Sequence, residues 1–352
     1  MDGAGAGHRM SAPEPERLDD RPPPPPSPAR APPPRAGAAR VSAPPRSDPR
    51  ASAQALPPLG FLLLAGLTLF WGGNWPTMKL ALAEIPVWPF RSMCLIAGGV
   101  ALLTLSRLSG RSIRVPTGEI RPLLVCVVFN ILGWHLLSGY GVSLIEAGRA
   151  SIIAFTMPLW ATLFSRFVLG EALTRAKLLG LAFGLAGLAV LIGPDLRSLG
   201  AAPLGAAFML GAAISWAMGT VVMKRFRWTI SVATMAGWQL LIGAVPITLG
   251  ALAFEEFPDL TELSPPAFAA LLYVLSFPMV FCHWAWFTVV RLFPAAIAAI
   301  GTLAIPIVGV FSSALLLGER VGLRELVALA LVCAALAVVL VLPGLRAAKA
   351  RP

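Results

Sequence analysis

The chain has 352 residues, of which 57% are hydrophobic and only 13% are charged, and its formal net charge is +11. An average soluble domain has roughly 45–50% apolar and about 25% charged residues, so a soluble fold of this length could not hide so much apolar surface. The basic excess indicates either a polyanionic partner or one side of a membrane.

Residues 1–58 differ in composition from the rest of the chain. They contain 16 of the 33 prolines, and their eight basic residues are nearly balanced by six acidic ones. Such a stretch buries too little apolar surface to offset the entropy of ordering, so we expect a disordered cytoplasmic tail. Its near balance of charge argues against a nucleic-acid partner, and the lack of an apolar core region argues against a signal peptide.

From Leu59 onward, ten apolar runs approach the roughly 20 residues that a helix needs to cross a membrane. We place them at 59–79, 86–105, 122–141, 148–169, 176–193, 203–223, 232–253, 267–289, 294–317 and 322–342. They are too continuous to be the alternating strands of a barrel. The sequence therefore predicts an all-α polytopic membrane protein with ten transmembrane helices and no soluble domain.

The distribution of basic residues predicts an orientation. The even-numbered loops and the C-terminal segment 343–352 hold fourteen Lys and Arg residues, whereas the odd-numbered loops hold five. The loop after the seventh helix has no basic residue and carries four acidic ones. Because positive charge stays on the cytoplasmic side, we expect both termini in the cytoplasm.

The chain also contains an internal repeat. A shift of 148 residues superposes Leu169-Gly170-Glu171 on Leu317-Gly318-Glu319 and Pro158 on Pro306. Each copy spans five helices, and because five is odd the second copy must enter the membrane from the opposite side. Inverted repeats of this kind are typical of secondary transporters that alternate access around a site near the midplane.

The motifs in both copies resemble a known family. The first copy has Trp71-Gly72-Gly73-Asn74 in its first helix and Arg91 in its second; the second copy has Trp216, matched to Trp71 by a shift of 145 residues, and Gln239 at the position of Arg91. Together with the Leu-Gly-Glu turns, these residues resemble EamA-type units of the drug/metabolite transporter superfamily. The resemblance implies two five-helix units, over 59–193 and 203–342, and an inner-membrane exporter or exchanger of small polar metabolites or drugs.

Arg91 is a candidate site residue because an ionisable group about five residues inside a membrane helix is energetically expensive. A planar guanidinium that faces a cavity suits an anion or a carboxylate. The alternative is an arginine that extends along the helix to the outer headgroups. The sequence leaves both interpretations open.

His135 and His283 are 148 residues apart and so occupy equivalent positions in the third and eighth helices. Inverted symmetry predicts that they lie near opposite ends of one central cavity, where imidazoles could load and release protons. A proton-coupled antiporter could use such a pair, although a histidine inside a helix is more often a satisfied hydrogen-bonding group. We expect no metal site, because no cysteine or carboxylate stands at ligand spacing beside either histidine.

Pro158 and Pro306 are predicted to interrupt their helices. Each removes one backbone hydrogen bond, which frees the carbonyls of Ala154 and Thr302 and allows a kink. Interruptions at matching places in two repeats are the best sequence indication of a transporter's binding site.

Aromatic and amide side chains complete the predicted cavity. The tryptophans that lie deeper in their helices are Trp71, Trp216 and Trp238, and the polar candidates are Asn74, Asn130, Tyr140 and Gln239. Such a lining would suit amino acids or aromatic amphiphiles, though core packing explains the tryptophans nearly as well.

Other features are expected to have local roles. Glu171 and Glu319 should cap the N-terminus of the next helix and pair locally. Gly180, Gly184 and Gly187 form a stripe for close helix packing, either between the repeats or in a homodimer. The four cysteines lie in apolar helices without close pairing, so no disulfide is expected.

The sequence as a whole predicts a secondary transporter that moves a small organic solute by alternating access across a lipid bilayer, with proton coupling left open. A channel or a non-transporting sensor remains an alternative. A membrane-embedded enzyme is disfavoured because no GxSxG, HExxH or carboxylate pair occurs within the helices. No GxxxxGK[ST] motif is present, so we expect that transport is not powered by ATP hydrolysis in this chain. We therefore expect no cofactor.

Overall fold

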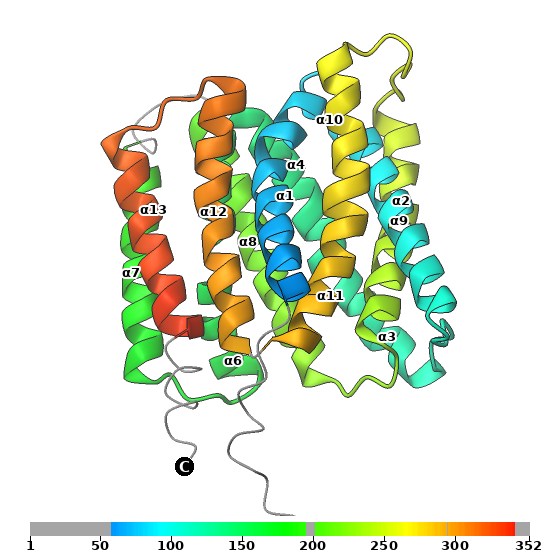
Figure 1. Ribbon diagram of the computed structural model, residues 1–352, viewed down its shortest axis with the longest axis horizontal. Helices are drawn as coiled ribbons and strands as arrows, with labels where there is room; N and C mark the ends of the chain where they lie inside the picture. The colour runs from blue at the N-terminus through cyan, green and yellow to red at the C-terminus, as the bar shows by residue number, and fades with distance from the viewer. Residues whose placement is uncertain (1–57, 195–200, 294, 342–352) are drawn as a thin grey trace, which may run out of the picture. The chain divides into compact units, whose positions relative to one another are not determined.

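The computed structural model describes residues 58–194, 201–293 and 295–341. These residues are helical apart from short connections, and no strand occurs among them (Figure 1). The predicted all-α membrane fold is confirmed. The predicted tail up to residue 57 and the C-terminal segment 343–352 lie outside the described residues.

The first repeat contains five helical stretches, two of which are composite. They are α1 (Pro58–Leu82), α2 (Val87–Leu108), α3 (Thr117–Cys126) with the π-helical η2 (Val127–Gly133) and α4 (Trp134–Leu144), α5 (Ala147–Ala154) with α6 (Met157–Val168), and α7 (Arg175–Ile192). The second repeat consists of α8 (Ala201–Arg225), α9 (Val232–Phe254), α10 (Pro265–Ser276) with η4 (Phe277–Phe281) and α11 (Cys282–Leu292), α12 (Ala295–Leu317), and α13 (Leu323–Leu336) with η5 (Ala337–Val341).

These stretches match the ten predicted segments one for one. In the described part of the chain, eight are long and apolar enough to cross a membrane, and Thr302–Leu317 of α12 is a shorter apolar helix. The tenth, α1, is 25 residues long and carries Asn74 and Lys79 in its second half. Part of this polar half lines the cavity described below.

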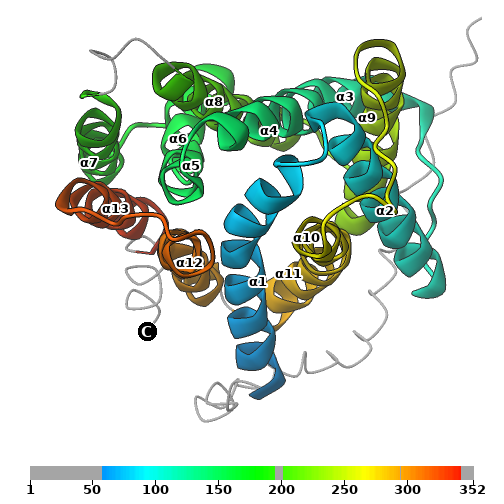
Figure 2. The ribbon, with the colours of Figure 1, turned by 90° about the horizontal axis from the view of Figure 1, so that it is seen from above.

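The packing has the exchange symmetry expected of two inverted repeats. The pair α2 and α9 and the pair α7 and α13 each join equivalent helices, and Figure 2 shows the two pairs on opposite sides of the bundle. The helix α1 packs on α12, α10 and α11, just as α8 packs on α6, α3 and α4. The first helix of each repeat therefore packs against helices of the other repeat, and both repeats surround a common centre.

The Leu-Gly-Glu turns end the fourth helical stretch of each repeat in the same way. Gly170 has φ +72° and Gly318 has φ +68°, a left-handed backbone that favours glycine and commonly terminates helices. The backbone N–H of Glu171 bonds back to the Ser165 carbonyl, which closes the first of these turns. Figure 1 shows the turn from α6 to α7 and the turn from α12 to α13 at opposite ends of the bundle. These turns contain Glu171 and Glu319.

The third stretch of each repeat contains a π-helical segment that the sequence did not indicate. The shift of 148 residues places the second part of η2, residues 129–133, on η4, residues 277–281. His135 and His283 each follow as the second residue of the next α-helix, in α4 and α11. Because π-helical turns are rare and occur frequently at functional sites, their repetition directs attention to these two histidines.

The two matching prolines have different effects, which corrects the prediction. At Pro158 the helical stretch is interrupted, since α5 ends at Ala154 and α6 begins at Met157. At Pro306 the helix α12 continues without a break from Ala295 to Leu317. A proline at the start of a helix costs no hydrogen bond, because the N–H groups of the first turn have no intrahelical partner. A proline inside a membrane helix is tolerated where neighbouring groups bond to the backbone carbonyl that it leaves without a partner.

The glycine stripe of α7 packs within the chain. A Cβ on Gly180 would lie 3.1 Å from the Ala335 carbonyl oxygen, and one on Gly187 would lie 3.2 Å from the Ala328 carbonyl oxygen, both on α13. Gly184 instead faces Leu159 of α6. Of the two roles predicted for this stripe, the structure assigns contact between the repeats.

Candidate functional site

A cavity of about 420 Å³ is lined by residues of both repeats. Its volume lies within the roughly 300–1,000 Å³ that is usual for small-molecule sites. Seven of the residues singled out from the sequence line it, namely Trp71, Asn74, Arg91, His135, Pro158, Trp216 and His283. They come from α1, α2, α4, α6, α8 and α11.

Arg91 is buried at the wall of this cavity, with only 4% of its surface exposed. Its Nε donates to the His135 carbonyl oxygen at 2.8 Å, and its Nη2 donates to Ser138 Oγ at 2.9 Å and to Met78 Sδ at 3.0 Å. All three acceptors are uncharged. Of the two interpretations that the sequence left open, the structure supports a guanidinium that faces the cavity, because the side chain is buried inside the bundle and lines the cavity.

The two histidines line the same cavity. His283 Nδ1 lies 2.9 Å from the Pro278 carbonyl oxygen, so an Nδ1–H tautomer would donate there and leave Nε2 as an acceptor. His135 Nδ1 is buried and has no hydrogen-bond partner among the described residues. A ligand or a proton would therefore meet two imidazoles in different hydrogen-bonding states.

Aromatic side chains form two walls, each built around one of the two repeat-related tryptophans. Trp71 of α1 lies 5.9 Å from the His283 ring and 6.1 Å from the Trp286 ring, measured between centroids. Its counterpart Trp216 of α8 lies 5.1 Å from the Trp134 ring. In each pair, the tryptophan from the first helix of one repeat meets an aromatic ring of the other repeat, and such pairs suit a flat apolar ligand.

Three predicted candidates do not line the cavity, and each bonds to another part of the bundle. Asn130 Nδ2 donates to Gln239 Oε1 at 3.1 Å, so these two amides satisfy each other within the bundle. Trp238 Nε1 donates to the Ile113 carbonyl oxygen at 2.7 Å, in the connection between α2 and α3.

Tyr140 also lies outside the cavity lining. Its hydroxyl accepts a hydrogen bond from Trp88 Nε1 at 2.8 Å and contacts Glu255 Oε1 at 3.3 Å. The side chain thus joins α4 to the start of α2 and the end of α9. Four predicted candidates therefore do not line the cavity and instead form contacts between helices, namely Asn130, Tyr140, Trp238 and Gln239.

Ser138, Trp134 and Trp286 line the cavity although they were not chosen as site candidates. A usable signal was present for two of them. Ser138 and Trp286 each follow a site histidine by three residues, which places them on the same helical face. No such spacing marks Trp134, which directly precedes His135.

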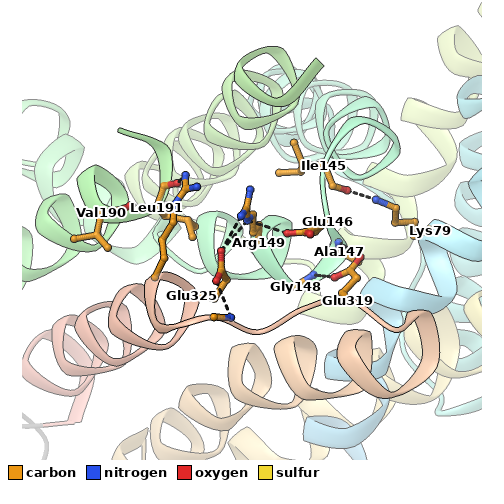
Figure 3. A network of polar contacts seen from close by, with 12 residues as sticks. Lys79, Ile145, Glu146, Ala147, Gly148, Arg149, Val190, Leu191, Glu319 and Glu325 are labelled. Atoms are coloured by element: carbon orange, nitrogen blue, oxygen red, sulfur yellow. Dashed lines mark hydrogen bonds and ion pairs between the residues drawn. The ribbon is translucent and has the colours of Figure 1, made fainter. Parts of the chain in front are cut away.

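A network of polar contacts joins the repeats at one end of the bundle (Figure 3). Glu319, in the turn between α12 and α13, accepts hydrogen bonds from the backbone N–H groups of Ala147 at 2.6 Å and Gly148 at 2.9 Å. The Lys79 ammonium of α1 donates to the nearby Ile145 carbonyl. A helix N-terminus attracts a carboxylate because its first N–H groups lack intrahelical partners. Glu319 therefore caps α5 of the other repeat, and not the next helix as predicted.

Two arginines extend the same network. Arg149 of α5 pairs with Glu325 of α13, with Nη2 and Oε1 at 2.9 Å. Arg324 donates from Nε to the Val190 carbonyl oxygen at 3.2 Å and from Nη2 to the Leu191 carbonyl oxygen at the end of α7. The start of α13 and the turn before it are therefore tied to both α5 and α7.

Glu171 occupies the equivalent turn at the opposite end, with a different partner. Its carboxylate accepts a hydrogen bond from Lys177 Nζ at 2.9 Å. This bond, with the charges of Lys177 and Lys224, holds the pKa of Glu171 below its ordinary value. Glu171 pairs locally, as predicted, but the predicted capping is wrong, because the Thr174 side chain caps α7. The counterpart of Glu171, Glu319, instead joins the two repeats.

Within the described residues, no group of three or more His, Cys, Asp or Glu side chains is placed to hold a metal ion. Cys94, Cys126, Cys282 and Cys333 are free thiols. The chemistry of the cavity therefore lies in Arg91, the two imidazoles, Asn74 and the aromatic walls.

Membrane-length helices in two inverted repeats, with a partly polar cavity between them, define a class of multi-pass membrane transport proteins. The EamA-like transporter family matches residues 58–193 and 203–341, and the chain belongs to this family. A solved crystal structure described only as that of a protein has the same fold, with a TM-score of 0.58 and 21% identity over 84% of this chain and 99% of that one.

Relatives of the chain include proteins named as transporters. It is 31% identical to the uncharacterized transporter YvbV of Bacillus subtilis, over 79% of this chain and 90% of that protein. It is 26% identical to a probable amino-acid metabolite efflux pump of Salmonella typhimurium, over 79% of this chain and 93% of that protein. It is also 27% identical to the aromatic amino acid exporter YddG of Ancylobacter novellus, over 49% of this chain and 61% of that protein.

Proposed function

We propose that this protein is a secondary transporter of the inner membrane that exports or exchanges a small organic metabolite, amino-acid-like or drug-like, by alternating access. The observation that carries the proposal is the cavity lined by both repeats, with a buried cation and paired aromatic rings. The names of three relatives support the direction and place: two are an efflux pump and an exporter, and the Escherichia coli relative YedA is named an inner membrane transporter.

The contrast between the two ends of the bundle supports alternating access. Glu319 and its network hold the two repeats together at one end of the bundle. The distribution of basic residues, which favours the cytoplasmic side, predicts that this end is periplasmic. At the other end, Glu171 is held by Lys177 of its own repeat. A carrier closes one end of its cavity at a time, so two equivalent carboxylates should form cross-repeat contacts in different states.

The repeat identifies the groups that Glu171 would contact in the opposite state. A shift of 148 residues maps Ala147-Gly148 on Ala295-Ala296, at the N-terminus of α12, and a shift of 145 residues maps Lys79 on Lys224. In the state open at the Glu319 end, Glu171 would leave Lys177 and cap α12, beside Lys224. We call the Glu319 contacts the outer latch and the proposed Glu171 contacts the inner latch.

The export function is tested by comparing metabolites in cells that lack the gene with cells that carry it. Loss of the gene should raise the internal concentration of at least one small solute, and the wild-type gene should restore it. Trp216→Ala, which removes a cavity wall, should fail to restore it at equal protein level in the membrane. Trp238→Ala is the matched control outside the cavity and should restore export. Identical metabolite profiles with and without the gene would refute the proposal.

His135 and His283 are the groups proposed for proton coupling, since both line the cavity. If protons are exchanged for solute, a pH gradient imposed across vesicles drives solute flux in the wild type. His135→Gln or His283→Gln should remove the gradient-driven part while solute exchange at equal pH persists. Gradient-driven flux that survives both substitutions would remove the histidines from the coupling mechanism.

A further inference from the structure

The central tryptophan of each aromatic wall has a counterpart in the other repeat, but the charge of the cavity does not. Trp71 and Trp216 are equivalent and both line the cavity. Arg91 lines it too. Gln239, its counterpart at a shift of 148 residues, does not line the cavity, and its Oε1 accepts a hydrogen bond from Asn130 at 3.1 Å. One half of the cavity therefore contributes a cation that the other half does not match.

Among the residues that the structure describes, no acidic side chain balances this cation. The described residues that line the cavity include no Asp or Glu. Within the described part of the chain, Arg91 forms no ion pair, and its acceptors are a carbonyl, a hydroxyl and a thioether. A buried charge without a counter-charge is unfavourable, so an anionic ligand would gain more here than at an exposed arginine.

The guanidinium is held in a fixed orientation, which prepares it for a ligand. A Cβ on Gly139 of α4 would lie 2.6 Å from Val87 Cγ1 and 3.4 Å from Arg91 Nε, so α4 packs closely against this part of α2. The three hydrogen bonds to protein atoms use Nε and Nη2. A planar, oriented guanidinium is well suited to a carboxylate and loses little freedom on binding it.

We propose that the cavity selects aromatic monocarboxylates of net negative charge, with the carboxylate on Arg91 and the ring against the tryptophan walls. This inference rests on the proposed function, because the same cavity would be the transport site. A zwitterionic amino acid brings an ammonium group that finds no carboxylate among the described lining residues. The same acid without its amino group should therefore bind more tightly, which distinguishes this site from a receptor for amino acids.

The test is isothermal titration of the purified full-length protein in detergent with four matched indole compounds. Indole-3-propionate is an anion, its methyl ester is neutral, tryptophan is the zwitterion with the same skeleton, and tryptamine is a cation. The anion should bind about 10- to 100-fold more tightly than the ester, the range for a hydrogen bond to a charged group. Tryptophan should bind less tightly than indole-3-propionate, and tryptamine should bind least tightly.

Arg91→Gln should remove the preference for the acid over the ester, and Arg91→Lys should retain part of it. Arg166→Gln, at an exposed residue in the last turn of α6, is the matched control and should retain all of it. Equal affinity of the wild type for acid and ester, tighter binding of tryptophan, or no binding of the acid at millimolar concentration would overturn the inference, whether or not the Arg91 variants fold. Binding without solute flux would instead refute the transport function and leave the anion site standing.

Discussion

Replacing Glu319 by glutamine tests the outer latch with a small change in shape. The carboxylate now accepts two backbone hydrogen bonds, at 2.6 and 2.9 Å, and an amide has only one oxygen to accept them. A hydrogen bond to a charged group contributes about 1.5–3 kcal/mol, and partial exposure reduces this. A loss of about 2 kcal/mol from the closed state would raise the ratio of open to closed molecules about 30-fold at the Glu319 end.

The assay measures the reaction of a cavity cysteine with a membrane-impermeant maleimide. Met157→Cys places a thiol in the cavity lining, in a protein whose four native cysteines are replaced by alanine. With Glu319→Gln, labelling from the Glu319 side should accelerate and labelling from the opposite side should slow. Glu171→Gln weakens the proposed inner latch and should shift both rates in the reverse direction. Unchanged rates, or equal shifts in both variants, would refute the two-latch mechanism.

Two further predictions concern stability. Gly72→Val should destabilise the protein by about 1–3 kcal/mol, because a Cβ at Gly72 would lie 2.4 Å from Val308 Cγ1 where α1 meets α12. Gly118→Ala is the control in thermal unfolding, because a Cβ there would meet no atom within 4 Å beyond its own helix and chain neighbours. Equal midpoints for the two variants would contradict the packing. Hydrogen bonds from the Ser264 hydroxyl and N–H lower the pKa of Glu84, so their stabilisation is complete above the unfolded-state pKa and is lost as pH falls through the folded one. The wild type should therefore lose more thermal stability than Glu84→Gln on acidification below about pH 4.5, the ordinary carboxyl value; parallel losses would argue against this contact.

Features that depend on local sequence were predictable. Long apolar runs specified the membrane helices, and the Leu-Gly-Glu turns specified where the fourth stretch of each repeat ends. The shift of 148 residues also related His135 to His283, and both line one cavity. The burial cost of a charge singled out Arg91, although the sequence alone could not decide between the cavity and the membrane surface.

Contacts that depend on helix rotation were not predictable. In a helix that is apolar on all sides, no amphipathic pattern indicates which face points inward, so Trp238 and Gln239 were placed in the cavity although they bond to neighbouring helices. The same limit applies to Pro158 and Pro306, whose different effects depend on tertiary surroundings. Glu319 was assigned to its own helix end because its partners, Ala147 and Gly148, are more than 170 residues away.

The central claim is that the solute crosses the membrane through a cavity that opens to one side at a time. Counterflow in liposomes containing the purified protein tests it most directly, with a panel of labelled amino acids and aromatic carboxylates outside and the same unlabelled solute inside. A carrier predicts that the internal solute accelerates uptake, that uptake saturates, and that Trp216→Ala weakens both effects. Flux that rises without saturation and ignores the internal solute would indicate a channel, and binding without flux would indicate a sensor; either result would contradict the account.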